Sequence, residues 1–136
     1  MVVDASAAAS WFLASQATPS SKALRARLSH YETVAPVLLE LEIRNVMLLA
    51  ERRGAQTQAE TDLRLGQLFD LIKIRSERLE LAADRALPLA RETGLKLYDA
   101  IYLDMALGEG RSLATRDGRL IEAAKALSVD VHDLRG

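Results

Sequence analysis

Short apolar segments alternate along this chain with longer stretches in which apolar residues recur every three or four positions. The short segments are rich in Val, Ile, Leu and Ala and are bounded by charged or turn-forming residues, which is typical of buried strands. Five of them predict strands, at residues 1–4, 33–35, 71–74, 112–115 and 129–131.

The longer stretches have the periodicity of amphipathic helices. Pro36 is expected at a first helical position, where its missing N–H is not needed, and glycines such as Gly54 and Gly94 are expected to end helices. The predicted helices cover residues 5–14, 19–30, 36–53, 57–69, 78–92, 98–107 and 118–127.

This alternation predicts an α/β fold, a three-layer α/β/α sandwich around a short, mainly parallel sheet of about five strands. The chain has no linker, repeat or low-complexity segment, so we expect residues 1–136 to form a single domain. In sheets of this kind, ligands bind at the carboxyl ends of the strands, near the point where the strand order reverses. Functional residues are therefore expected at that edge.

Composition narrows the classes of protein that fit. The absence of cysteine excludes a disulfide scaffold, a thiolate metal site and a thiol nucleophile, and it fits a reducing compartment. The formal net charge of −1 provides no overall field for nucleic acid, so such binding would need a local basic patch. The apolar N-terminal segment lacks the basic region of a signal peptide, and no apolar run of about 18 residues occurs. We therefore expect a cytoplasmic protein that does not cross a membrane.

Acidic residues occupy positions where the predicted fold would bring them together. Asp4 ends the first strand and Asp117 follows the fourth, so both are expected at the carboxyl edge of a parallel sheet. Glu42 shares one helix face with Leu38 and Asn45, an unusual setting for a solvated acid.

A fourth acid, Asp99, lies in the first turn of the helix predicted at 98–107, beside its apolar side. Simpler explanations exist for each acid. The three aspartates could cap helices, which stabilises a helix by about 1 kcal/mol each, and Glu42 could pair with Arg44 or Arg53. Two strand ends and two helices can nevertheless face one corner of the fold, which favours a shared site.

A shared site of carboxylates indicates a metal ion. Clustered carboxylates repel one another, and burying them without partners is unfavourable. A divalent cation removes both problems, and oxygen-only ligands favour Mg²⁺ or Mn²⁺ over zinc. Because such an ion lowers the pKa of bound water and stabilises charge on a phosphate, the four acids predict metal-assisted hydrolysis of a phosphate ester.

Four segments of the chain carry recognisable motifs: VVDASA, APVLLELEIRNVMLLA, LKLYDAIYLDMAL and SLATRDGRLIEAA. They contain, in turn, a strand aspartate with a nearby hydroxyl, a Pro–Leu–acid–Asn helix, a YDA-x-Y-x-x-x-A helix, and a strand that ends in Thr, one residue, then Asp. Together they resemble the motifs of the PIN-domain ribonucleases, most closely the VapC-type toxins of type II toxin–antitoxin systems. They occur in the family's order and span nearly the whole chain.

The resemblance implies roles for individual residues. Ser6 and Thr115 match hydroxyl positions beside the acids, and Asn45 matches a supporting asparagine. Ordinary roles in a helical turn, a strand and a polar helix face remain alternatives for these three. The family's acidic set, which holds one or two Mg²⁺ or Mn²⁺ ions and orients the attacking water, falls on Asp4, Glu42, Asp99 and Asp117.

The resemblance also implies a substrate and partners. Family members cut RNA, often structured RNA such as tRNA, and leave a 5′-phosphate. A cognate VapB-like antitoxin neutralises them by laying its tail across the active-site groove. Homodimers are common in the family, and Leu24, Leu28 and Leu48 are candidates for apolar interface residues here. Substrate phosphates need a counter-charge. A basic rim beside the acids could be formed by Arg44, Lys96, Arg116 and Arg119. The alternative is that these four are ordinary solvated surface residues.

Other classes with carboxylates at strand ends fit less well. A haloacid-dehalogenase-type phosphatase needs a second Asp at position 6, but this residue is Ser. A response-regulator receiver domain needs a phosphorylatable Asp after the third strand, and the segment LIKIRSE has none. No phosphate-binding P-loop motif is present. Two alternatives remain open: a PIN-like scaffold that binds RNA or a protein without cleaving, and a nuclease that acts on DNA, since a metal site alone does not select the sugar.

Overall fold

A single parallel sheet organises the protein, whose computed structural model describes all 136 residues. The strand order is β3-β2-β1-β4-β5, and every pair of neighbours is parallel. The strands are β1 (Val2–Val3), β2 (Val34–Pro36), β3 (Lys73–Arg75), β4 (Leu113–Thr115) and β5 (Val131–Asp133).

Every pair of consecutive strands is connected through at least one α-helix. Two short 3₁₀ helices, Ala14–Gln16 and Leu28–His30, flank α2. The α-helices are α1 (Ala5–Phe12), α2 (Pro19–Arg25), α3 (Leu38–Arg52), α4 (Gln58–Leu71), α5 (Leu79–Thr93), α6 (Leu97–Glu109) and α7 (Gly118–Ala126).

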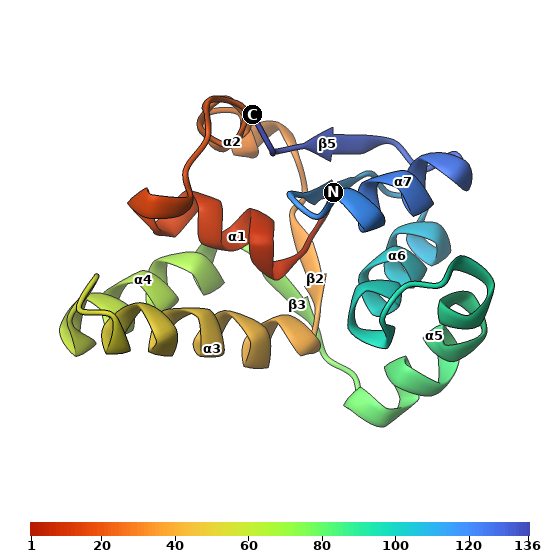
Figure 1. Cartoon of the computed structure of the whole chain (residues 1–136), viewed down its shortest axis with the longest axis horizontal. Coiled ribbons are helices and arrows are strands. Elements are labelled where there is room, and N and C mark those ends of the chain that lie inside the picture. Colours follow the sequence, from red (N-terminus) through yellow and green to blue (C-terminus); the bar gives the residue numbers. More distant parts are fainter.

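The helices cover both faces of the sheet. Helices α1, α3 and α4 lie on one side, and α5, α6 and α7 lie on the other, as Figure 1 shows. Helix α6 packs across the three central strands β2, β1 and β4, while α1 packs on β4 from the opposite face. The predicted three-layer α/β/α sandwich is confirmed, with a sheet that is wholly parallel.

Local chemistry explains where several helices begin and end. The hydroxyls of Thr18 and Thr57 accept hydrogen bonds from backbone N–H groups in the first turns of α2 and α4. Gly94 ends α5 with a φ of 74° and Gly110 ends α6 with a φ of 62°, a left-handed conformation that glycine adopts without strain. No helix is both long enough and apolar enough to cross a bilayer.

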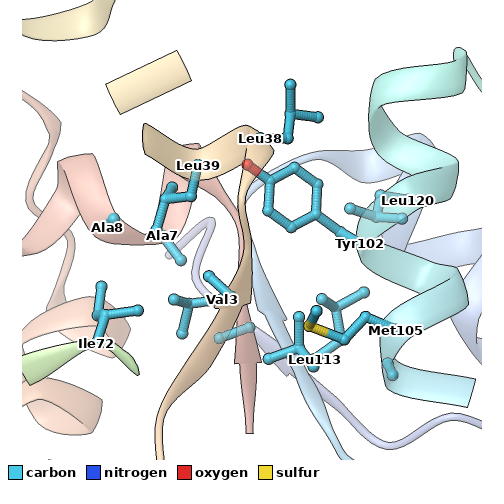
Figure 2. Packing of buried hydrophobic residues seen from close by; sticks show 14 of the residues in the cluster. Val3, Ala7, Ala8, Leu38, Leu39, Ile72, Tyr102, Met105, Leu113 and Leu120 are labelled. Atoms are coloured by element: carbon cyan, nitrogen blue, oxygen red, sulfur yellow. The ribbon is translucent and has the colours of Figure 1, made fainter. Parts of the chain in front are cut away.

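The core is mostly aliphatic, as the low aromatic content suggests. Its central strands are fully buried, and Tyr102 is the largest side chain buried among them. Figure 2 shows the Tyr102 ring extending from α6 over the sheet toward Leu38 and Leu39 at the start of α3. Tyr102 therefore connects the two helical layers at one end of the sheet.

Some predicted boundaries are wrong. Pro36 ends β2, opposite Arg75 of β3, and α3 begins two residues later; the fixed φ of proline suits a strand end as well as a helix start. The third strand begins at Lys73 because α4 continues to Leu71. The last strand lies two residues later than predicted, because β4 pairs with it from Val131 onward.

The prediction that Leu24 and Leu28 supply a dimer surface is also wrong. Each side chain is only 6% exposed and belongs to the core of its own chain. The predicted helix at 19–30 breaks after Arg25, and the 3₁₀ turn that follows points Leu28 inward. Of the three proposed interface residues, only Leu48 is exposed.

Candidate active site

The strand order reverses between β1 and β4. The chain builds β1, β2 and β3 outward in one direction and then crosses back to place β4 on the other side of β1. Val2 and Val3 pair with Leu113 and Ala114, so the next residues, Asp4 and Thr115, emerge side by side at the carboxyl edge. This is where an open parallel sheet offers a ligand site.

Asp4 is buried and held by three donors. Its Oδ1 accepts hydrogen bonds from the Ser6 hydroxyl at 2.7 Å and from the Ala7 backbone N–H at 2.8 Å. Its Oδ2 accepts a short hydrogen bond from the Thr115 hydroxyl. The bond to Ala7 caps α1, so the predicted cap role and a place at the site apply together.

Ser6 and Thr115 connect Asp4 to the loop that follows β4. The Ser6 Oγ accepts a hydrogen bond from the backbone N–H of Arg116 at 2.9 Å. The Thr115 Oγ1 accepts one from the backbone N–H of Asp117 at 3.0 Å. The two hydroxyls therefore fix the distance between β1 and the turn that carries Asp117.

Asp117 caps α7 through a hydrogen bond from the Leu120 N–H to its Oδ1, at 3.0 Å. Only one of its two carboxylate oxygens is used in this way, which leaves the other for a ligand. The cap and a ligand role are compatible here, as they are for Asp4.

Glu42 reaches the site from α3 on the opposite face of the sheet. Its Oε1 accepts a hydrogen bond from the Tyr102 hydroxyl at 2.7 Å, and it forms no ion pair with Arg44 or Arg53. The alternative of a surface ion pair is therefore not found. Burial and the adjacent Glu42 carboxylate raise the pKa of Tyr102, so its hydroxyl stays protonated and donates to Glu42.

Asp99 differs from the other aspartates because it caps nothing. The N-cap position of α6 is Lys96, which makes no side-chain cap bond, and Asp99 lies half-buried in the first turn. Burial raises the pKa of Asp99, and the nearby carboxylates of Asp117 and Glu42 raise it further. The simple cap explanation therefore fails for this residue.

The four acids form one electrostatic group. Burial raises the pKa of Asp4 to about 6; hydrogen bonds from Thr115, Ala7 and Ser6 oppose this rise, while the charge of Asp99 adds to it. Asp99 thus interacts with each of the other three acids. Two strand ends and two helices therefore place these acids within electrostatic range of one another.

A model of the PIN domain family matches residues 1–126 of this chain. The chain belongs to the PIN domain family. It is 32% identical over 123 residues to ribonuclease VapC3 of Mycobacterium tuberculosis, in two strains, and the match covers 90% of this chain and 86% of the relative. The crystal structure of PAE2754 from Pyrobaculum aerophilum has the same fold, with a TM-score of 0.71, 23% identity, and coverage of 96% of this chain and 87% of that one.

The four basic residues predicted near the acids lie in different settings in this PIN domain. Lys96 is exposed one turn before Asp99 and favours its charged form, and Arg119 is exposed in the first turn of α7. Arg116 lies beside Ser6, and its Nε is buried without a hydrogen-bond partner. Arg44 instead lies over the Phe69 ring, 5.0 Å from its centroid, and donates to the Glu40 carbonyl.

The donor set of the PIN domain fits a hard divalent cation in its chemistry. All four acids offer oxygen, and no histidine or cysteine lies among them. No three acidic side chains converge closely enough to form a complete metal site. Asp99 accepts no hydrogen bond, and Asp117 uses only one carboxylate oxygen, so both residues keep oxygens free of protein partners.

Tyr102 is the residue of this site that sequence reasoning missed. The helical periodicity of α6 places Tyr102 on the apolar side of the helix, and the side chain is buried. Its hydroxyl has a partner 60 residues away on another helix, which no local pattern reveals. The signal in the sequence that could have indicated this contact is the tyrosine hydroxyl, because a buried tyrosine O–H usually has a hydrogen-bond partner. Asn45, in contrast, is exposed on α3 and forms no hydrogen bond to the acids.

Proposed function

We propose that this protein is a metal-dependent endoribonuclease of the VapC type that hydrolyses RNA phosphodiester bonds. The similarity to ribonuclease VapC3 supports RNA as the substrate. The observation that carries the proposal is Asp99: it is half-buried, caps no helix, and lies near enough to Asp4, Asp117 and Glu42 for their charges to affect one another. Acids whose pKa is raised by burial and by neighbouring carboxylates occur preferentially at functional sites.

Asp4, Glu42, Asp99 and Asp117 are the residues that would hold Mg²⁺ or Mn²⁺. When bound, the ion would offset the repulsion among the acids and polarise the attacking water and the phosphate. Ser6 and Thr115 hold the Asp4 carboxylate in one orientation, and Tyr102 does the same for Glu42. Lys96, Arg116 and Arg119 supply positive charge next to the acids, where RNA phosphates would approach.

The same relationship supports further features of the proposal. Residues 1–136 would act as one PIN domain in the cytoplasm, where an RNA such as tRNA is met. A cognate VapB-like antitoxin would neutralise it, with a basic side chain directed at the acids through charge-assisted hydrogen bonds. A homodimer would use exposed apolar residues such as Leu48 instead of Leu24 and Leu28.

Neighbouring glutamates on α3 provide a matched test of the site. Glu42→Gln should lower the cleavage rate at least about 10-fold, the order expected when a group that orients or binds a metal loses its charge. Glu40→Gln should leave the rate unchanged, because Glu40 is exposed. Rates are measured on one RNA at saturating Mg²⁺. A large loss for Glu40→Gln alone would show that the wrong glutamate has been assigned.

The choice between RNA and DNA is tested with matched oligonucleotides. The purified, antitoxin-free protein is incubated with an RNA and a DNA of the same sequence in Mg²⁺ and in Mn²⁺. Cleavage of the RNA alone supports the proposal. Cleavage of the DNA alone assigns the site to a different substrate, and binding of RNA without cleavage identifies a scaffold.

A further inference from the structure

A small cavity adjoins the acids between the start of α3 and the start of α6. Its volume is about 360 Å³, and it is lined by Leu38, Leu41, Glu42, Asn45 and Tyr98. Glu42 therefore belongs both to the wall of this cavity and to the acidic site, so the two are continuous.

Two of the lining side chains are unusually exposed for their type. Leu41 is 65% exposed and Tyr98 is 58% exposed, although both are large and apolar. Single exposed apolar side chains are common on protein surfaces, but here an aliphatic and an aromatic side chain line the same hollow. Tyr98 directly precedes Asp99 in α6, which ties its position to that of the acid.

Resting on the proposed function, we propose that this cavity is a nucleobase subsite, in which an unpaired base next to the scissile phosphate stacks on Tyr98. When a phosphate of the RNA lies at the acids, the nucleoside bonded to it must lie close by. Because Glu42 is both one of these acids and part of the cavity wall, the cavity is within reach of that nucleoside. An exposed aromatic ring offers a stacking face to any base, and single-strand binding proteins obtain much of their affinity in this way.

The remaining lining residues suit a base better than an apolar protein segment. Leu41 and Leu38 provide an apolar edge, while the exposed Asn45 amide can donate to and accept from the edge of a base. The cavity is too small for a helix face and has an acidic wall in Glu42. The protein would therefore cut RNA where a base is unpaired, because a base inside a helix cannot reach Tyr98.

A cycle of protein and substrate changes tests this subsite. The cleavage site in a natural RNA is first mapped, and a short single-stranded RNA that spans this site is synthesised. A series of variants of this RNA is then made, each with one nucleotide next to the cleavage site replaced by an abasic one. For the intact RNA, Tyr98→Ala should raise KM roughly 5- to 100-fold, the range expected for loss of one stacked base, while Tyr98→Phe should behave like the wild type. At one flanking position the abasic RNA should show the same defect with the wild type and no further defect with Tyr98→Ala.

Leu63→Ala is the matched control, since Leu63 is 63% exposed on α4 and lies outside the cavity. It should leave KM and kcat unchanged. Equal KM values for the wild type and Tyr98→Ala, with cleavage intact, would overturn the subsite, while the ribonuclease proposal would stand. Absence of cleavage by the wild type itself would instead refute the proposed function on which the subsite rests.

Discussion

Asp99→Asn abolishes RNA cleavage and leaves the fold intact: this is the result that we expect for the acid at the centre of the site. Replacing groups that support metal ligands costs about 10- to 100-fold, so the loss for a ligand itself should be at least about 100-fold. The fold should survive because Asp99 caps no helix and is repelled by Asp117 and Glu42. Removing its charge relieves that repulsion.

The measurement combines cleavage kinetics with thermal unfolding of the same preparations. Asp104→Asn is the control on the same helix, since Asp104 lies five residues further along α6 and pairs with Arg85 instead of facing the acids. It should keep nearly full activity. If Asp99→Asn unfolds the protein, Asp99 is a structural residue and its assignment to the site is wrong.

Asp4→Asn should stabilise the metal-free protein at neutral and alkaline pH. The pKa of Asp4 is about 6 in the folded chain against an ordinary value of 3.8, so the folded state binds the proton more tightly than the unfolded state. The free energy of unfolding contributed by this group therefore falls as pH rises from about 4 to about 6, by about 3 kcal/mol in total. Asparagine is neutral throughout and avoids that loss.

The test is the difference in melting temperature between Asp4→Asn and the wild type, measured in EDTA across the acid and neutral range. The difference should be small near pH 4 and should grow to roughly 10 °C above pH 7. Using the difference cancels the ionisable groups that do not interact with Asp4. Asp130→Asn, an exposed acid before β5, should show no such trend. A constant or negative difference for Asp4→Asn would contradict the burial of an ionised Asp4.

The position of half of the site follows from the sequence alone. In a parallel sheet, residues that follow strands emerge at one edge, so Asp4 and Asp117 could be placed together without any contact being known. The pattern also indicated that Glu42 was unusual, because it shares a helix face with Leu38. Local periodicity does not show that α3 and α6, which lie on opposite faces of the sheet, come into contact at its edge. The hydrogen bond between Tyr102 and Glu42 is that contact.

Apolar residues limited the prediction in a different way. Periodicity shows that Leu24 and Leu28 lie on one side of a helix, but it does not show whether that side faces the protein's own core or a second copy. The end of α2 at Arg25 decides the question: no glycine or proline follows there to signal it, and Leu28 is buried in the 3₁₀ turn beyond it. For Tyr98 the limitation is the opposite one. The sequence motif places it directly before Asp99, but only its exposure at the cavity indicates that it could bind a base.

The central claim, a metal-dependent ribonuclease, is tested most directly by incubating total RNA with the purified, antitoxin-free wild-type protein. Four conditions suffice: Mg²⁺, Mn²⁺, EDTA, and EDTA followed by excess Mg²⁺. We predict discrete fragments with 5′-phosphate ends in the presence of metal, none in EDTA, and their return when Mg²⁺ is restored. Fragments that persist in EDTA would contradict the metal-binding role of the four acids, and RNA that stays intact in every condition would contradict the nuclease itself.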